Sequence, residues 1–307
     1  MPILVNDSWL KQYFRNFDCP ETTLIPTDDL DCYVLYPVFR WVYNKLLICE
    51  KQDLCHAPHG IEPPAFPVFS KPIYNLRGMG VGSRFILTKE DYDLRQQPGH
   101  LWMVLLQGEH VSSDVAVVDG QAQQWFHVVG KLGEKNGTFD YWTILNYQKP
   151  EIEEYCGRWL DKHLKGYTGM VNLETIDSKI IEVHLRFSDQ WLDLYNKHFL
   201  QALVNLYTNK VWQAVAPSVK VTYSVVLFQD HGYKYVHPPK SIIDQILKNS
   251  DISSLQITFD EKKPTQSYSM PSGGLRLGVI NCFDLQSGLR ARELLSRYFR
   301  ATRKIMV

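Results

Sequence analysis

The sequence predicts an α+β protein (mixed α/β) in which strands and helices are largely grouped apart. Residues 66–130 contain short apolar or alternating runs separated by glycine turns, which is the pattern of a mostly antiparallel sheet. Later segments carry apolar residues at helical spacing over 150–164, 188–207 and 284–300. A polar hairpin at 166–186 joins these parts and holds the densest group of chemically active side chains.

The composition is that of an ordinary globular protein, because 45% of the 307 residues are apolar and 21% are charged. Lysine plus arginine equals aspartate plus glutamate at 33 each, which argues against a nucleic-acid partner bound through a basic field. No apolar run is long enough to span a bilayer, so no membrane partner is predicted. The six cysteines form no CxxC pair and the N-terminus lacks a signal-peptide pattern, so we expect a cytoplasmic protein with reduced thiols.

The first part of the chain predicts little regular structure. Residues 1–36 are expected to form a short N-terminal region with a helix over 7–14 and a strand over 32–36. Pro37 opens an apolar pattern at helical spacing, and this pattern places Lys45 in a helix. The proline-rich stretch that follows ends this unit, so we interpret residues 37–65 as a linker helix and a connection.

Residues 66–130 predict a small lobe with a glycine-rich loop. Val68–Lys71 is a strand, and the loop that carries Gly78, Gly80 and Gly82 returns into a second strand over 83–87. Glycines allow a backbone to approach a phosphate, although a flexible turn gives the same pattern. The loop is neither a P-loop nor a dinucleotide fingerprint, because no GKS or GKT follows and a strand replaces the helix. Three further strands are predicted, over 101–106, 110–118 and 124–130.

Residues 131–307 predict a large lobe. A helix over 150–164 leads into the polar hairpin, and Ser188 or Asp189 can cap a helix that runs to about Tyr207. Asp284 is the predicted cap of the last helix. The remaining elements are strands over 219–228, 255–259 and 275–281 and a short helix over 241–248.

The hairpin Gly166–Arg186 turns at Asp177-Ser178-Lys179. Because side chains alternate along a strand, a three-residue loop places Glu174 opposite Glu182 and Asn172 opposite His184, all on one face. Two carboxylates, an amide and an imidazole on one face form a candidate site for a divalent cation. A half-buried hairpin with a polar solvent face remains the alternative.

The order of these motifs over residues 36–195, and more weakly to the end, resembles the ATP-grasp superfamily of ATP-dependent carboxylate–amine or carboxylate–thiol ligases. The resemblance implies two α+β lobes with ATP between them. Lys45 and Lys71 would contact the phosphates under a lid at Gly78–Gly82. Three residues would bind the adenine through their backbone, and Glu109 would bind the ribose; the three are Met103, Leu105 and Leu106.

The segment Glu182-Val183-His184-Leu185-Arg186 is similar to the E-x-N-x-R motif of that superfamily. By this resemblance Glu182, with Asn172, Glu174 and His184, would hold Mg²⁺ at the phosphates, and Arg186 would be the catalytic residue that stabilises an acyl phosphate. His184 stands where the motif has asparagine, so Mn²⁺ is an alternative cation, because imidazole is a poorer ligand of magnesium.

The function implied by the resemblance is an ATP-dependent ligase that acts on a small-molecule carboxylate and an amine. Two alternatives remain open: a degenerate ATP-grasp protein that binds nucleotide as a regulator, and a scaffold without a nucleotide site. Convergence of Glu174 and Glu182 favours the enzyme, whereas internal pairing of His184 favours the regulator. His110, Arg158 and Arg276 are either substrate contacts or structural residues.

Overall fold

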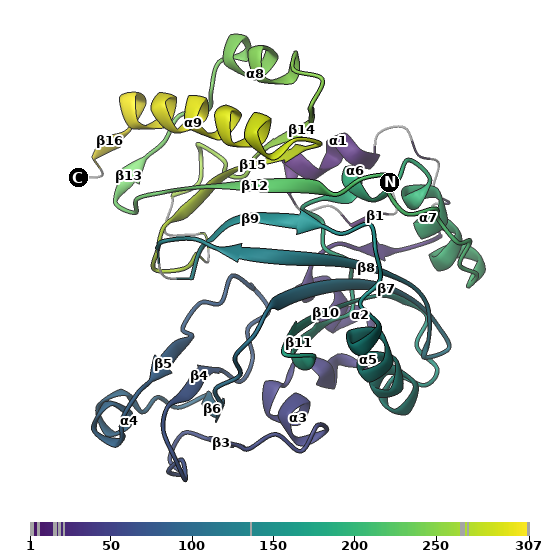
Figure 1. The fold of residues 1–307 in the computed structure, drawn as a ribbon, viewed down its shortest axis with the longest axis vertical. Coiled ribbons are helices and arrows are strands. Elements are labelled where there is room, and N and C mark those ends of the chain that lie inside the picture. Colours follow the sequence, from purple (N-terminus) through teal and green to yellow (C-terminus); the bar gives the residue numbers. More distant parts are fainter. Residues whose placement is uncertain are drawn as a thin grey trace.

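A computed structural model of the chain describes residues 3–4, 7–14, 17, 20, 22–135, 137–264, 268 and 270–305. A large antiparallel sheet forms the centre of the molecule (Figure 1). Its strand order is β11-β10-β7-β8-β9-β12-β15-β14, and every neighbouring pair is antiparallel. In that order the strands are Lys179–His184, Gly169–Ile176, His110–Val118, Gln121–Leu132, Phe139–Ile144, Thr222–Gln229, Leu275–Cys282 and Ile252–Ile257.

A small antiparallel sheet lies to one side of the large sheet (Figure 1). It has the order β3-β6-β4-β5, with strands His56–Pro58, His100–Val104, Val68–Pro72 and Arg84–Ile86. The prediction of one antiparallel sheet over 66–130 is therefore wrong, because β7 and β8 belong to the large sheet. The boundaries of the two lobes stay a prediction. Residues 105–109 follow β6 and are not part of a strand. β7 then lies between β10 and β8, and its side chains are buried on both faces of the sheet.

Helices cover both faces of the large sheet, and each face has its own apolar core. One face packs against α6 (Leu192–Tyr195) and α7 (Phe199–Asn209), around Phe126 and Met170. The other face packs against α5 (Pro150–His163) and, at the far edge, against α9 (Leu285–Thr302).

The shorter elements surround these layers. They are α1 (Lys11–Phe14), α2 (Asp29–Leu35), α3 (Lys45–Glu50), α4 (Lys89–Arg95), α8 (Lys240–Leu247), β1 (Ile3–Leu4), β2 (Ile25–Pro26), β13 (Tyr233–Lys234) and β16 (Lys304–Ile305). No helix in the described ranges is long and apolar enough to cross a membrane.

Two elements near the site differ from the prediction. The strand expected over 32–36 is the helix α2, since the Asp28 side chain accepts a hydrogen bond from the Asp31 backbone N–H and caps the first turn. The single helix expected from Ser188 to Tyr207 is divided into α6 and α7. Asn196 has an extended backbone between them, and its amide donates to the carbonyl of Ala216.

The predicted cap of the last helix is confirmed, because Asp284 Oδ1 accepts a hydrogen bond from the backbone N–H of Ser287 at 2.7 Å. Asp284→Ala should lower the free energy of unfolding by about 1 kcal/mol, since the first turn of α9 loses an acceptor. Urea unfolding measures this loss. Asp284→Asn is the matched control, because it keeps an oxygen in the same position and should retain most of the stability; equal losses in both variants would contradict a capping role.

Candidate functional site

The hairpin pairs Glu174 with Glu182 and Asn172 with His184, which confirms the predicted register. The turn itself differs from the prediction. Asp177 and Ser178 both have positive φ and form a two-residue loop, and the extra residue is taken up by a bulge opposite Glu174 and Thr175. The shorter loop and the bulge compensate, so the four polar side chains keep one face.

The bulge has a direct consequence for Lys71, the residue near the end of β4. It leaves the carbonyl of Ile181 outside the strand ladder, and Lys71 Nζ donates to that oxygen at 2.8 Å. Lys71 is only 2% exposed, and burial lowers its pKa, although the nearby Glu182 carboxylate opposes that shift. The small sheet is thus joined to the hairpin through a buried amino group.

Three donor atoms converge at the edge of the large sheet. One atom from each of Glu174, Glu182 and His184 lies within 4.8 Å of the others. His184 Nε2 lies 3.8 Å from Glu174 Oε1 and 3.6 Å from Glu182 Oε2. His184 is 4% exposed, whereas both carboxylates reach solvent in part. The structure therefore brings together three of the four predicted metal ligands.

Neighbouring groups hold the outer oxygens of the two carboxylates. Glu174 Oε2 accepts a hydrogen bond from His110 Nε2 at 3.1 Å, and Lys45 Nζ lies 3.6 Å from Glu182 Oε1. Burial opposes ionisation of Glu174, but the hydrogen bond and the charge of His110 lower its pKa overall. Lys45 is the first residue of α3, and the Asn44 side chain caps this helix. Lys45 is buried, so its amino group is fixed beside Glu182.

Asp29, at the start of α2, links His184 and Arg186. Its Oδ2 lies 3.0 Å from His184 Nδ1, and it accepts two hydrogen bonds from the Arg186 guanidinium, both at 3.0 Å. Burial alone would raise the pKa of Asp29, yet Arg186 and His184 hold it well below its usual range. Asp29 also raises the pKa of Arg186, against the effect of burial. His184 thus pairs internally and also faces the carboxylates.

Asn172, the fourth predicted ligand, has its amide nitrogen turned toward β7. This nitrogen donates to Ser112 Oγ at 2.8 Å and to Asp114 Oδ1 at 2.7 Å. Asp114 is fully buried and also accepts hydrogen bonds from the Ser188 backbone N–H and the Tyr195 hydroxyl. Burial raises the pKa of Asp114 to about 6 in spite of these donors. That Asn172 binds a cation through its side-chain amide oxygen stays a prediction.

The residues predicted to contact the nucleotide lie around the small sheet. Met103 is buried against Cys49 and Leu101, and Leu106 packs on the same cluster with Ile181 of β11. Leu105 follows β6 and is half-buried. Glu109 is half exposed and forms an ion pair with Lys149.

Two glycines of the glycine-rich loop, which are predicted to contact the nucleotide, have free space beside them. Gly78 and Gly80 have φ of +65° and +59°, and a β-carbon at either position would meet no atom within 4 Å. A positive φ is a conformation that glycine adopts without steric cost. Contacts of this loop with a nucleotide stay a prediction.

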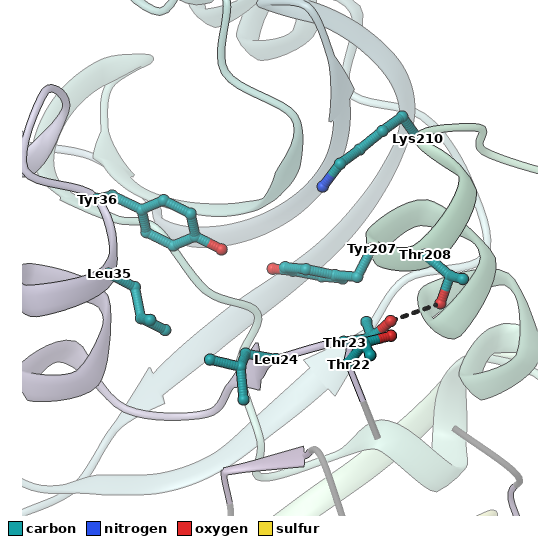
Figure 2. A pocket seen from close by; sticks show the side chains of 8 residues that line it. All are labelled: Thr22, Thr23, Leu24, Leu35, Tyr36, Tyr207, Thr208 and Lys210. Carbon is teal, nitrogen blue, oxygen red and sulfur yellow. Dashed lines mark hydrogen bonds between the residues drawn. The ribbon is translucent and has the colours of Figure 1, made fainter. Parts of the chain in front are cut away.

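A separate cavity of about 380 Å³ lies at the C-terminal end of α2, beside Leu35 and Tyr36, and contains none of the predicted site residues. Figure 2 shows Tyr36, Tyr207 and Lys210 pointing into it, above a hydrogen bond of 3.2 Å between Thr23 and Thr208. The cavity therefore does not belong to the candidate site.

Sequence reasoning missed Asp29, His110 and Asp114 as members of the site. Asp29 lies in the segment predicted to precede a strand, and His110 and Asp114 lie on β7, which the sequence pattern places with the small lobe. Alternation along β7 was a usable signal, since His110, Ser112 and Asp114 share one face and pair across to β10. Arg158 pairs with Glu154 on the surface of α5, and Arg276 donates to Gln190 Oε1 at 3.3 Å.

Comparison with known proteins identifies the fold. No family model matches the chain and no curated protein matches it in sequence. Among solved structures, L-amino acid ligase from Bacillus licheniformis has a TM-score of 0.62 at 12% identity, over 97% of this chain and 83% of that one. Phosphoribosylamine–glycine ligase from Thermotoga maritima has a TM-score of 0.60 at 13% identity, over 96% and 86%.

A third similar structure is carboxyaminoimidazole ribonucleotide synthase from Aspergillus clavatus complexed with ATP. It has a TM-score of 0.58 at 11% identity, over 87% of this chain and 78% of that one. These neighbours are ATP-grasp enzymes, and the chain has the α+β ATP-grasp fold that its motifs predicted. A fold hosts many chemistries, so function must be argued from the site.

Proposed function

We propose that this chain is an ATP-dependent ligase that activates a carboxylate as an acyl phosphate and joins it to an amine or another nucleophile. The observation that carries the proposal is the convergence of Glu174, Glu182 and His184 with two buried lysines, Lys45 and Lys71, where the small sheet meets the hairpin. The similar structures are ligases and synthases of small molecules, one of them solved with ATP, which supports this reading.

The donor set fits a divalent cation that accompanies ATP. Two carboxylate oxygens and an imidazole nitrogen face a common space, and each side chain is held by a neighbour. When bound, the cation would neutralise phosphate charge during transfer. Glu174, Glu182 and His184 would hold it, as Mg²⁺ or Mn²⁺.

The remaining residues would position and neutralise the reactants. Lys45 and Lys71 would lie against the phosphates, and their burial keeps their amino groups in place. Arg186, already fixed by Asp29, would face the charge that develops on the acyl phosphate. The backbone at Met103, Leu105 and Leu106, together with Glu109, would bind the nucleoside. Small-molecule substrates and a cytoplasmic location belong to the same proposal.

Lys71→Ala tests the nucleotide site by calorimetry with ATP and either Mg²⁺ or Mn²⁺. We expect the wild type to bind ATP only with a cation, and the variant to lose at least about tenfold in affinity, because a charge-assisted contact to phosphate is removed. Lys89→Ala is the matched control, since Lys89 is an exposed lysine of the same lobe that pairs with Glu62. Unchanged ATP affinity in Lys71→Ala would contradict the placement of Lys71 at the phosphates. Cation-dependent ATP binding by the wild type justifies a screen of carboxylates and amines for ADP release.

One observation favours a second candidate, a nucleotide-binding regulator without turnover. His184 and Arg186 are both engaged with Asp29, so the E-x-N-x-R region is partly used for internal pairing. ATP binding that is indifferent to the cation, with no ADP release from any substrate pair, would support this candidate over the ligase.

A further inference from the structure

We infer that the cation site selects a first-row transition metal such as Mn²⁺ over Mg²⁺, and that Asp29 is the positioning residue that makes His184 a ligand. The inference deepens the proposed function, and it rests on that function only for the role of the cation beside ATP. It is carried by the contacts of three side chains, each of which has one atom anchored by the protein and one atom directed into the shared space.

The first contact sets the tautomer of His184. The carboxylate of Asp29 is paired with the Arg186 guanidinium and can only accept hydrogen bonds. His184 Nδ1 lies 3.0 Å from it and therefore carries the proton. In the neutral ring, Nε2 is then left with its lone pair, and this atom faces Glu174 and Glu182. A carboxylate behind a metal-ligating histidine is the usual way to fix its ring and raise its basicity.

The two carboxylates are oriented in the same manner. His110 holds Glu174 Oε2 and leaves Oε1 toward His184, while Lys45 is nearer to Glu182 Oε1 and leaves Oε2 toward His184. The distances from Nε2 to these free oxygens, 3.8 and 3.6 Å, are too long for hydrogen bonds. Ligand atoms at about 2.1 Å from one ion lie about 3 to 3.5 Å from each other. The three donor atoms would therefore have to move only slightly closer together to bind one ion.

The chemistry of this donor set decides the cation. Mg²⁺ demands oxygen ligands in near-ideal octahedral geometry, whereas imidazole nitrogen suits transition metals. His184 is 96% buried, because its exposed fraction is 4%, so it cannot turn to solvent and leave the site to oxygen ligands alone. The ring is also fixed against Tyr43, whose centroid lies 6.4 Å away. A buried, oriented nitrogen therefore disfavours Mg²⁺ and favours Mn²⁺.

Electron paramagnetic resonance of Mn²⁺ tests the inference, because bound Mn²⁺ is counted directly and needs no turnover. The wild-type chain is titrated with Mn²⁺ and then with competing Mg²⁺, with and without a non-hydrolysable ATP analogue. We expect Mg²⁺ to displace half of the Mn²⁺ only at a large excess. His184→Asn should lower Mn²⁺ affinity by about 10- to 100-fold and remove most of the preference.

Two further measurements keep the test decisive. Asp29→Asn should shift Mn²⁺ affinity in the same direction, while His231→Asn, an exposed residue between β12 and β13, should change nothing. Electron spin echo measurements on wild-type Mn²⁺ should show coupling to an imidazole nitrogen, which requires no variant to fold. Displacement of Mn²⁺ by equal Mg²⁺, or Mn²⁺ without nitrogen coupling, would overturn the inference. Mn²⁺ selectivity without any ATP binding would instead overturn only the proposed function.

Discussion

Asp29→Ala should lower the free energy of unfolding by about 3 to 5 kcal/mol, because it leaves the Arg186 charge buried without its partner. Asp29 is 3% exposed and receives both the guanidinium fork of Arg186 and the Nδ1 contact of His184. The midpoint of urea unfolding, followed by circular dichroism, measures the loss. Few single substitutions reach this size unless they break a buried network of this kind.

A double-mutant cycle distinguishes the ion pair from a general packing effect. Arg186→Met removes the other charge and should also be costly alone, since the buried Asp29 carboxylate then keeps only its contact with His184. The double variant should be more stable than the sum of the single losses predicts, by about 1 to 3 kcal/mol, since no unpaired charge remains from this pair. Strictly additive losses would show that the two side chains do not stabilise each other.

Glu182→Gln should reduce ADP release by at least about 100-fold once a substrate pair has been found, because the amide keeps the shape but removes the charge that holds the cation. Glu182 has two roles in the structure: Oε1 is near Lys45 and Oε2 faces His184. The variant should still fold, since it fills the same volume. Its Mn²⁺ affinity should fall together with its turnover.

Glu62→Gln provides the matched control for this prediction, since Glu62 is an exposed glutamate that pairs with Lys89 in the small lobe. It should retain wild-type turnover and cation affinity. Turnover near the wild-type level in Glu182→Gln would contradict a role of Glu182 in cation binding. Loss of turnover with unchanged Mn²⁺ affinity would place Glu182 elsewhere in the reaction.

The sequence predicted the local parts of the site well. Alternation along two strands placed Asn172, Glu174, Glu182 and His184 on one face, and the structure confirms their pairing. The hairpin reaches this pairing through a shorter turn and a bulge. The pairing is unchanged because the face of a side chain depends on the total number of residues around the loop and not on the loop type. The helix cap at Asp284 could be predicted for the same reason, since its hydrogen-bond partner lies only three residues away in the chain.

The tertiary structure decided which distant groups complete the site. Asp29 lies 155 residues from His184 in the chain, and His110 reaches Glu174 only because β7 pairs with β10 instead of with the small sheet. Strand order and helix docking depend on how whole apolar faces are buried, and no short window of sequence carries that information. Periodicity and capping act within a few residues, so the sequence by itself determined the ligand face, while the packing of α2 and β7 determined how those ligands are held.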